Sequence, residues 1–212
     1  AVASRLDEAN VLAAVFRLLD DEVSDVREVA GIVVTSRIGE AAVLAAILPL
    51  VHHKNWLMRI TACAALKSRI GEAAVLGAVL PLLGDAFYGV RQEACETVAS
   101  RIDEPEVLAL VLPLLRDEAE PVRTAACAAV APRIAEPKVL AAVVPLLGAR
   151  LYCERRAACR AVASRTGEPE ILALVLPLTR DDDSFVRAAA CTAVMTRIGL
   201  PAVAPVEEEN DA

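Results

Sequence analysis

Apolar and polar residues follow one another along this chain with the spacing of short amphipathic helices. In residues 100–131, apolar side chains cluster from Val107 to Leu115 and give a first helix a wide apolar surface. After a polar interruption, a second set returns at spacings of three and four: Val122, Ala126, Ala129 and Val130. The pattern predicts one helix over about residues 104–115 and a second, antiparallel to it, over about 118–133.

The same pattern returns every 32 residues without insertion or deletion. The phrase that opens at Ser4 recurs at Ser36, Ser68, Ser100, Pro132 and Ser164. A fixed period of this length is typical of solenoids, in which each unit buries its apolar face only by stacking on its neighbours. We therefore predict an all-α fold, a right-handed α-α superhelix (α-solenoid) that forms a single domain over residues 1–212. Its repeats are 4–35, 36–67, 68–99, 100–131, 132–163 and 164–195, and 196–212 form a partial cap and an acidic tail.

Polar residues, prolines and glycines mark the expected ends of the helices. Asp103 and Glu104 offer an acidic cap to the first helix, and Pro105 suits its first turn. Pro113 lies late in the same helix and should kink it. Asp117 should cap the second helix. The glycines that follow this helix in four copies are expected to adopt a left-handed stop: Gly39, Gly71, Gly167 and Gly199.

Composition narrows the class of protein. The chain is 56% hydrophobic but only 3% aromatic, and its apolar mass is mostly Ala, Val and Leu, which suits closely packed helices. The longest uncharged apolar run, residues 73–84, is shorter than the roughly 20 residues of a membrane span. No secretory signal is visible. Because residues 1–3 match residues 161–163 at the end of a later repeat, we expect the chain to start inside a helix of a preceding repeat.

Six cysteines and two histidines are the candidate metal or redox residues. Five cysteines share one repeat position: Cys63, Cys95, Cys127, Cys159 and Cys191. Equivalent positions on stacked helices lie about 8–10 Å apart, farther than the roughly 7 Å that a disulfide allows, so we expect buried thiols and a reducing, cytoplasmic location. Cys153 is off this position and is expected to be accessible. His52 and His53 are adjacent without a supporting cluster, so we expect a displaced helix cap and no metal site.

The aromatic residues carry the functional signal. The single Trp and both Tyr fall at one repeat position, as Trp56, Tyr88 and Tyr152. On a helical wheel this position lies nearly opposite the apolar face of the second helix. It shares a stripe with the residues four and eight positions later, which vary from repeat to repeat. The stripe residues that we expect to bind a partner are Trp56, Ile60, Tyr88, Gln92, Tyr152, Arg156 and Arg160. On the same helical wheel Phe87 points closer to the apolar core, so we expect it to take no part in partner binding.

The repeat resembles HEAT repeats, in particular the short HEAT-like units also seen in phycobilisome lyases. The resemblance covers residues 4–198 and rests on the proline late in the first helix, the aspartate before the second, and the Val-Arg pair within it. In HEAT arrays that aspartate and arginine form a polar ladder between units, a role that the resemblance implies for Arg27, Arg59, Arg91, Arg123, Arg155 and Arg187. His53 and Ala149 depart from the pattern, because they stand where the aspartate should be. The resemblance also implies that the second helix of each repeat lines a concave surface, where artificial HEAT-like binder libraries vary a similar set of positions.

Charge is distributed as a mosaic. The net charge is −7, but residues 36–67 carry +3 and residues 132–163 carry +4, while the other repeats are acidic. A nucleic-acid groove would need a continuous basic stripe, so this mosaic argues against one. There is no nucleophile elbow, phosphate loop or histidine-carboxylate arrangement, so no catalytic residue and no cofactor is expected.

These observations predict a non-enzymatic scaffold that binds a protein partner on the concave surface. Two alternatives from other classes stay open. A phycobilisome-lyase-like chaperone would bind a bilin chromophore in stoichiometric amounts, and a nucleic-acid-binding HEAT-like protein would lose affinity steeply with salt. A further possibility is that the chain is an engineered repeat array. The uninterrupted 32-residue register favours this possibility, and the five cysteines at a core position argue against it. Because Leu6, Val11 and Phe16 would lie at an uncapped N-terminal face, end-to-end self-association or continuation into further repeats is also expected.

Overall fold

The computed structural model describes residues 9–197, and within that range it is built from α-helices and short 3-10 helices without β-strands. Each repeat contributes an A helix and a B helix. The A helices are α1 (Ala9–Leu18), α3 (Ala41–Ile47), α5 (Ala73–Val79), α7 (Pro105–Val111), α9 (Pro137–Val143) and α11 (Pro169–Val175). The B helices are α2 (Ser24–Ser36), α4 (Trp56–Leu66), α6 (Tyr88–Val98), α8 (Glu120–Val130), α10 (Tyr152–Ala161) and α12 (Ser184–Arg197). The predicted all-α solenoid of helical hairpins is confirmed.

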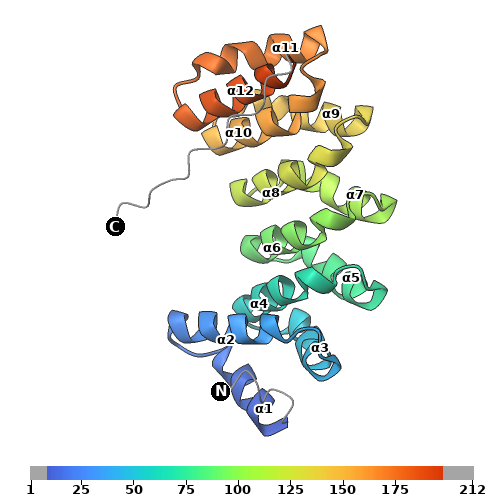
Figure 1. Ribbon diagram of the computed structural model, residues 1–212, viewed down its shortest axis with the longest axis vertical. Helices are drawn as coiled ribbons and strands as arrows, with labels where there is room; N and C mark the ends of the chain where they lie inside the picture. Colours follow the sequence, from blue (N-terminus) through green and yellow to red (C-terminus); the bar gives the residue numbers. More distant parts are fainter. Residues whose placement is uncertain (1–8, 198–212) are drawn as a thin grey trace. The chain divides into compact units, whose positions relative to one another are not determined.

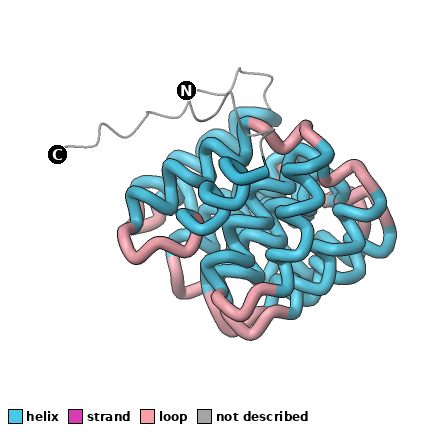
Figure 2. The backbone as a smooth tube through the Cα atoms, turned by 90° about the horizontal axis from the view of Figure 1, so that it is seen from below, coloured by secondary structure: helices cyan, strands magenta, loops and turns pink. Residues whose placement is uncertain are grey.

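The described chain divides into two compact units, unit 1 (Ala1–Ala129) and unit 2 (Val130–Ala212). In unit 1 the A helices α3, α5 and α7 follow one another in one row and the B helices α4, α6 and α8 in another (Figure 1). Short loops connect the helices throughout the described residues (Figure 2). The handedness of the superhelix and its concave side concern both units together and stay predictions. The end-to-end contact through Leu6 and Val11 falls outside the described residues and side chains. Of the cap and tail expected over 196–212, residues 196 and 197 belong to α12 and the others lie outside the described residues.

Proline kinks the A helices, as predicted. In the fourth repeat α7 ends at Val111 and the chain continues as a 3-10 helix, Leu112–Arg116, with Pro113 at its second position. Proline has no N–H to donate to the preceding turn, and its ring crowds the carbonyl four residues back, so the α-helical ladder stops here. Four other repeats make the same change at Pro49, Pro81, Pro145 and Pro177.

The polar residues at the helix ends act differently from the prediction. Glu104 is the N-cap residue of α7, but its side chain makes no capping hydrogen bond and pairs with Arg101 instead. Asp117 lies in the loop before α8, where Oδ1 accepts the Ala119 N–H at 2.9 Å, so it stabilises the turn and not the helix end. The described glycines Gly39, Gly71 and Gly167 do not adopt the left-handed conformation, because the B helices leave through a further turn and need no reversal there. Gly199 lies outside the described residues.

The core lies between the two rows of helices and between successive B helices. The predicted residues Val122, Ala126, Ala129 and Val130 of α8 are all buried. Their small size lets the B helices approach closely, and α4 packs against α6 in unit 1 as α10 packs against α12 in unit 2. Each fully buried Val or Leu contributes roughly 1.5–3 kcal/mol of hydrophobic stabilisation.

The cysteine position is buried in all but the last copy. Cys63, Cys95, Cys127 and Cys159 are buried, and the half-buried Cys153 is more accessible, both as predicted. The prediction is wrong for Cys191, which is exposed. Cys191 lies on α12, the last described helix, and no described B helix follows to cover it. Burial at this position therefore depends on the next repeat, not on the residue's own helix.

An arginine–aspartate ladder joins successive repeats, as the HEAT resemblance implied. Arg91 donates from Nε and Nη2 to the two carboxylate oxygens of Asp117 at 2.8 and 2.7 Å, and from Nη1 to the Asp85 carbonyl at 2.8 Å. The same bidentate pairs link Arg59 to Asp85 and Arg155 to Asp181. Each pair ties a B helix to the loop of the following repeat, so the ladder fixes the stacking register within each unit.

The first rung of the ladder lacks its carboxylate. Arg27 donates to the carbonyls of Asp21 and Glu22 in its own loop at 2.7 and 3.0 Å, and the next repeat offers His53 in place of aspartate. In the repeats that have it, that aspartate also accepts the backbone N–H two residues later. His53 keeps this role, because its Nδ1 accepts the Asn55 N–H at 3.2 Å. The histidines themselves are not the helix cap: Asn55, two residues on, caps α4 by accepting the Leu57 N–H.

Replacing His53 with aspartate should complete this rung. We expect the free energy of unfolding to rise by about 0.5–1 kcal/mol, because Arg27 gains a carboxylate partner while the turn keeps its acceptor for the Asn55 N–H. Urea denaturation measures the change. His53→Asn keeps the acceptor without the charge and is the matched control. An aspartate variant no more stable than the asparagine variant would show that the rung does not form.

Candidate functional site

The variable stripe of the B helices is solvent-facing at its aromatic positions. Trp56, Tyr88 and Tyr152 are 43%, 46% and 48% exposed, although each belongs to a helix whose other side is buried. We call the side of the B helices that carries these positions, and those four and eight residues later, the helix-B face. Its residues are free of the fold's packing requirements, because the same positions hold Glu120 and Ser184 in other repeats.

In unit 1 three aromatic rings form a continuous cluster. The ring of Phe87 lies between those of Trp56 and Tyr88, with centroid separations of 4.2 and 5.0 Å and interplanar angles of 32° and 36°. The Phe87–Tyr88 separation is that of a favourable aromatic pair, and the Trp56 and Phe87 rings lie slightly closer than the usual range of about 4.5–7 Å. The aromatic cluster (Trp56, Phe87, Tyr88) therefore spans the first turns of α4 and α6 and keeps two of its rings nearly half exposed.

Sequence reasoning missed the part that Phe87 plays. The prediction placed Phe87 on a helical wheel, but it is the N-cap residue of α6, with φ −93° and ψ 121°, outside the helix. Its N–H donates to Asp85 Oδ1 at 2.8 Å, which holds the turn that aims the ring at Trp56. Extended backbone at this residue turns the side chain away from the azimuth that a helix would give it.

Gly89 makes room for the Phe87 ring. A Cβ atom at Gly89 would lie 2.9 Å from Phe87 Cε1 and 3.3 Å from Ile60 Cδ1. The first of these distances is shorter than any ordinary carbon contact. The missing side chain lets the ring lie flat against α6, and it places Ile60 next to the aromatic cluster.

Replacing Gly89 with alanine should displace the Phe87 ring without unfolding the protein. Alanine favours the helix by about 1 kcal/mol over glycine, while the ring can move because it is the free end of a side chain. We expect Trp56, the single tryptophan, to change its emission maximum and quenching by acrylamide while the urea midpoint stays equal or rises. Gly77→Ala in α5 is the control, because a Cβ there meets nothing within 4 Å. An unchanged Trp56 spectrum in the Gly89 variant would contradict the close approach.

Two shallow grooves flank the aromatic cluster in unit 1. Groove 1, about 650 Å³, lies between α2 and α4. Its lining is mostly apolar or small: Arg27, Gly31, Ile32, Thr35, Ser36, Leu57, Ile60, Thr61 and Ala64. Ile32 is 62% exposed on its wall, and Ile60 separates the groove from the aromatic cluster. Groove 1 and the cluster thus form one apolar surface across three B helices.

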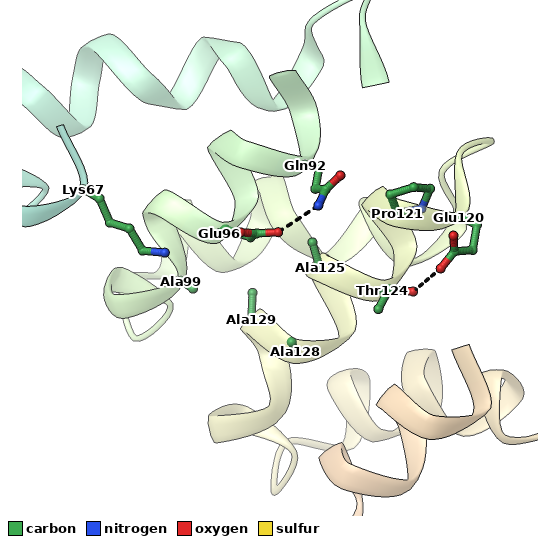
Figure 3. A pocket seen from close by; sticks show the side chains of 10 residues that line it. All are labelled: Lys67, Gln92, Glu96, Ala99, Glu120, Pro121, Thr124, Ala125, Ala128 and Ala129. Atoms are coloured by element: carbon green, nitrogen blue, oxygen red, sulfur yellow. Dashed lines mark hydrogen bonds between the residues drawn. The ribbon is translucent and has the colours of Figure 1, made fainter. Parts of the chain in front are cut away.

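Groove 2, about 510 Å³, lies between α6 and α8 and is drawn in Figure 3. Ala125, Ala128 and Ala129 form its alanine floor. Its rim is polar: Gln92 donates to Glu96 at 3.0 Å and Thr124 donates to Glu120 at 2.8 Å. These polar groups are satisfied within their own helices.

Unit 2 carries the remaining predicted residues on one helix. Tyr152, Arg156 and Arg160 lie at spacings of four along α10 and so share one side of it. The Arg156 guanidinium carbon lies 5.1 Å from the ring centroid of Phe185 on α12, a ring 39% exposed. Sequence reasoning missed Phe185, which stands one residue after the aromatic repeat position. The structure thus brings Trp56, Ile60 and Tyr88 together in unit 1 through Phe87, sets Gln92 at groove 2, and groups the other three in unit 2.

Neither a metal-binding cluster nor a membrane-spanning helix is found among residues 9–197. No group of three or more His, Cys, Asp or Glu side chains in this part of the chain is arranged to hold a metal ion. None of the described helices combines the length and the apolar character needed to cross a membrane.

Comparisons with known proteins agree on the fold. The structure is similar to YibA from Escherichia coli, with 22% identity and a TM-score of 0.71 over 87% of this chain and 70% of YibA. It is also similar to an engineered protein, with 17% identity and a TM-score of 0.55 over 88% of this chain and 96% of that protein. A third similar structure is Cex1p, with 14% identity and a TM-score of 0.58 over 93% of this chain and 43% of Cex1p. No protein with a curated function matches the sequence significantly. The HEAT repeats profile matches residues 76–152 and 152–208, well over half of the chain. With its 32-residue helical hairpins, arginine–aspartate ladder and proline-kinked A helices, the chain belongs to the HEAT repeat family.

Proposed function

We propose that this protein is a non-enzymatic scaffold that binds a partner protein through its helix-B face. The observation that carries the proposal is the aromatic cluster, which keeps Trp56 and Tyr88 nearly half exposed beside the apolar wall of groove 1. The repeat itself does not require aromatic residues there. Exposed rings that are ordered by one another offer apolar area at little further cost in side-chain entropy.

The kind of residue also supports a protein partner. Trp, Tyr and Arg dominate the energetics of protein interfaces, and each buried aromatic side chain contributes about 150–250 Å² of contact. Trp56 and Tyr88 are the anchors of unit 1, with Ile60 and Gln92 beside them, and Tyr152 is the anchor of unit 2. The binding energy of such anchors typically exceeds 2 kcal/mol each.

The test starts from affinity purification with the wild-type chain and with a Trp56/Tyr88/Tyr152 triple alanine variant. A protein recovered by the first and not by the second is then used in calorimetric titrations with single variants. Trp56→Ala and Tyr152→Ala should each weaken its binding at least about tenfold. Their thermal midpoints should stay close to that of the wild type, because neither ring is buried.

The matched controls are Leu110→Ala on α7 and Leu174→Ala on α11, whose side chains are 43% and 44% exposed on A helices. They remove similar exposed apolar area from the other row of helices, and binding should be unchanged. Equal binding by the wild type and the triple variant would rule out the helix-B face. Lowered stability with intact binding would mean that the aromatic rings serve the fold.

A further inference from the structure

Helix α10 of unit 2 carries two arginines on one side that the stacking of the repeats does not use. In the described part of this unit, three arginines at recurring positions are engaged in the fold: Arg155 with Asp181, Arg165 with Glu168 and Arg187 with its own loop carbonyls. Arg156 and Arg160 are not among these arginines. No carboxylate of the described residues lies within ion-pair distance of either. The equivalent positions hold Gln92 and Glu96 in the third repeat, so arginine is not needed there for stacking.

Arg156 and Arg160 share one side of α10 at an accessible surface. They are four residues apart on α10, which places them on one side of the helix about 6 Å apart at the level of Cβ. The contact with the Phe185 ring orients Arg156, and Arg160 is exposed. The pKa of Arg160 lies below its ordinary value, because the protein removes part of the water around its charged form and Arg156 repels it. Two like charges at this spacing destabilise the helix modestly, so an anion between them would relieve a repulsion that the fold leaves in place.

The surroundings favour carboxylates over a nucleic-acid backbone. Towards α12 the helix-B face continues as Ser184, Ala188 and Thr192, which are neutral, and the loop before α12 carries Asp182 and Asp183. The positions of α12 on the helix-B face therefore do not extend the two arginines into a basic stripe that could follow several phosphates. Tyr152, one turn before Arg156, adds an aromatic surface and a hydroxyl, which suits a peptide with acidic and apolar side chains.

We propose that Tyr152, Arg156, Arg160 and Phe185 form a docking site for an acidic, glutamate- or aspartate-rich segment of a partner protein. The proposal rests on the proposed function and specifies the chemistry of the partner that unit 2 would recognise. Each guanidinium can bind a carboxylate with two parallel hydrogen bonds, which a lysine could not do. The aromatic rings would cover the aliphatic parts of the segment.

The experiment measures fluorescence anisotropy of a fluorescein-labelled deca-glutamate peptide with the full chain at 150 mM salt. Saturable binding is expected, at least tenfold tighter than that of the matched deca-glutamine peptide. Arg156→Gln and Arg160→Gln should each weaken it at least about fivefold, because each removes a charge-assisted pair. Arg116→Gln removes the same charge from an exposed site in unit 1 and should leave it unchanged. Arg160 is the decisive position, since its exposed side chain can be replaced without touching the core.

Three outcomes would overturn the proposal. A ten-nucleotide thymidine strand that binds as tightly as the glutamate peptide would identify a general phosphate surface. Peptide binding that appears only when Glu207, Glu208 and Glu209 are all replaced by Gln would identify the chain's own acidic residues as the occupant. Unchanged affinity of the peptide for both arginine variants would show that the site does not exist. Binding of the partner through Trp56 and Tyr88 is tested separately, by the alanine variants of those residues.

Discussion

Replacing Arg91 with alanine should lower the free energy of unfolding by about 3 kcal/mol, because it leaves the Asp117 carboxylate buried without its main partner. The side chains of Arg91 and Asp117 are only 9% and 8% exposed, and two nitrogens of the guanidinium reach both carboxylate oxygens. Burial by itself raises the pKa of Asp117, but the hydrogen bonds from Arg91 and the Ala119 N–H and the charges of Arg91 and Arg123 outweigh it. The pKa therefore lies below its ordinary value. Urea denaturation followed by circular dichroism measures the loss.

Arg27→Ala is the matched control for this effect. Arg27 occupies the same repeat position and makes the same bonds to its own loop carbonyls, but the following repeat offers His53 instead of aspartate. We expect its removal to cost about 1 kcal/mol, the value of ordinary hydrogen bonds at a partly exposed site. If both alanine variants lost the same stability, the contribution of the ladder carboxylate would be negligible.

Thiol labelling in the native state should separate the cysteines by more than a thousandfold in rate. Burial, with smaller contributions from nearby charges, raises the pKa of Cys63, Cys95 and Cys159 to about 12. At pH 8 about one such thiol in ten thousand is ionised, against roughly a quarter of ordinary exposed thiols, and the thiolate is the reactive form. Cys191 should react first and the half-buried Cys153 more slowly, while the three raised thiols and the buried Cys127 stay protected.

The rates are followed by the release of thionitrobenzoate from 5,5′-dithiobis(2-nitrobenzoate), and peptide mapping assigns each rate to a cysteine. Cys191→Ser should remove the fastest phase and leave the others unchanged. Labelling in 8 M urea should bring all six cysteines to similar rates, because the burial that separates them is lost. Fast native labelling of Cys63 or Cys95 would show that the B helices of unit 1 separate readily, in conflict with the packing of α4 against α6.

The sequence by itself determined the helices and their order. Apolar spacing, a proline at one fixed place and a 32-residue register are local or repeated signals, so the start of α6 at Tyr88 implied the start of α8 at Glu120. The ladder, including the rung that His53 interrupts, was implied by the resemblance to HEAT repeats, which rests on an Arg and an Asp that recur in the repeat. Apolar spacing, proline position and register need no knowledge of how one hairpin stacks on the next.

The tertiary structure decided what the stacking brings into contact. Trp56 and Phe87 are 31 residues apart, and their rings meet only because α4 packs against α6 and because Phe87 lies in an extended turn outside the helix. Cys191 differs from Cys159 in exposure although both follow the same repeat rule, since the covering helix belongs to another repeat. Local patterns report the preferences of one segment, whereas burial and ring contacts depend on the neighbouring segment that the fold supplies.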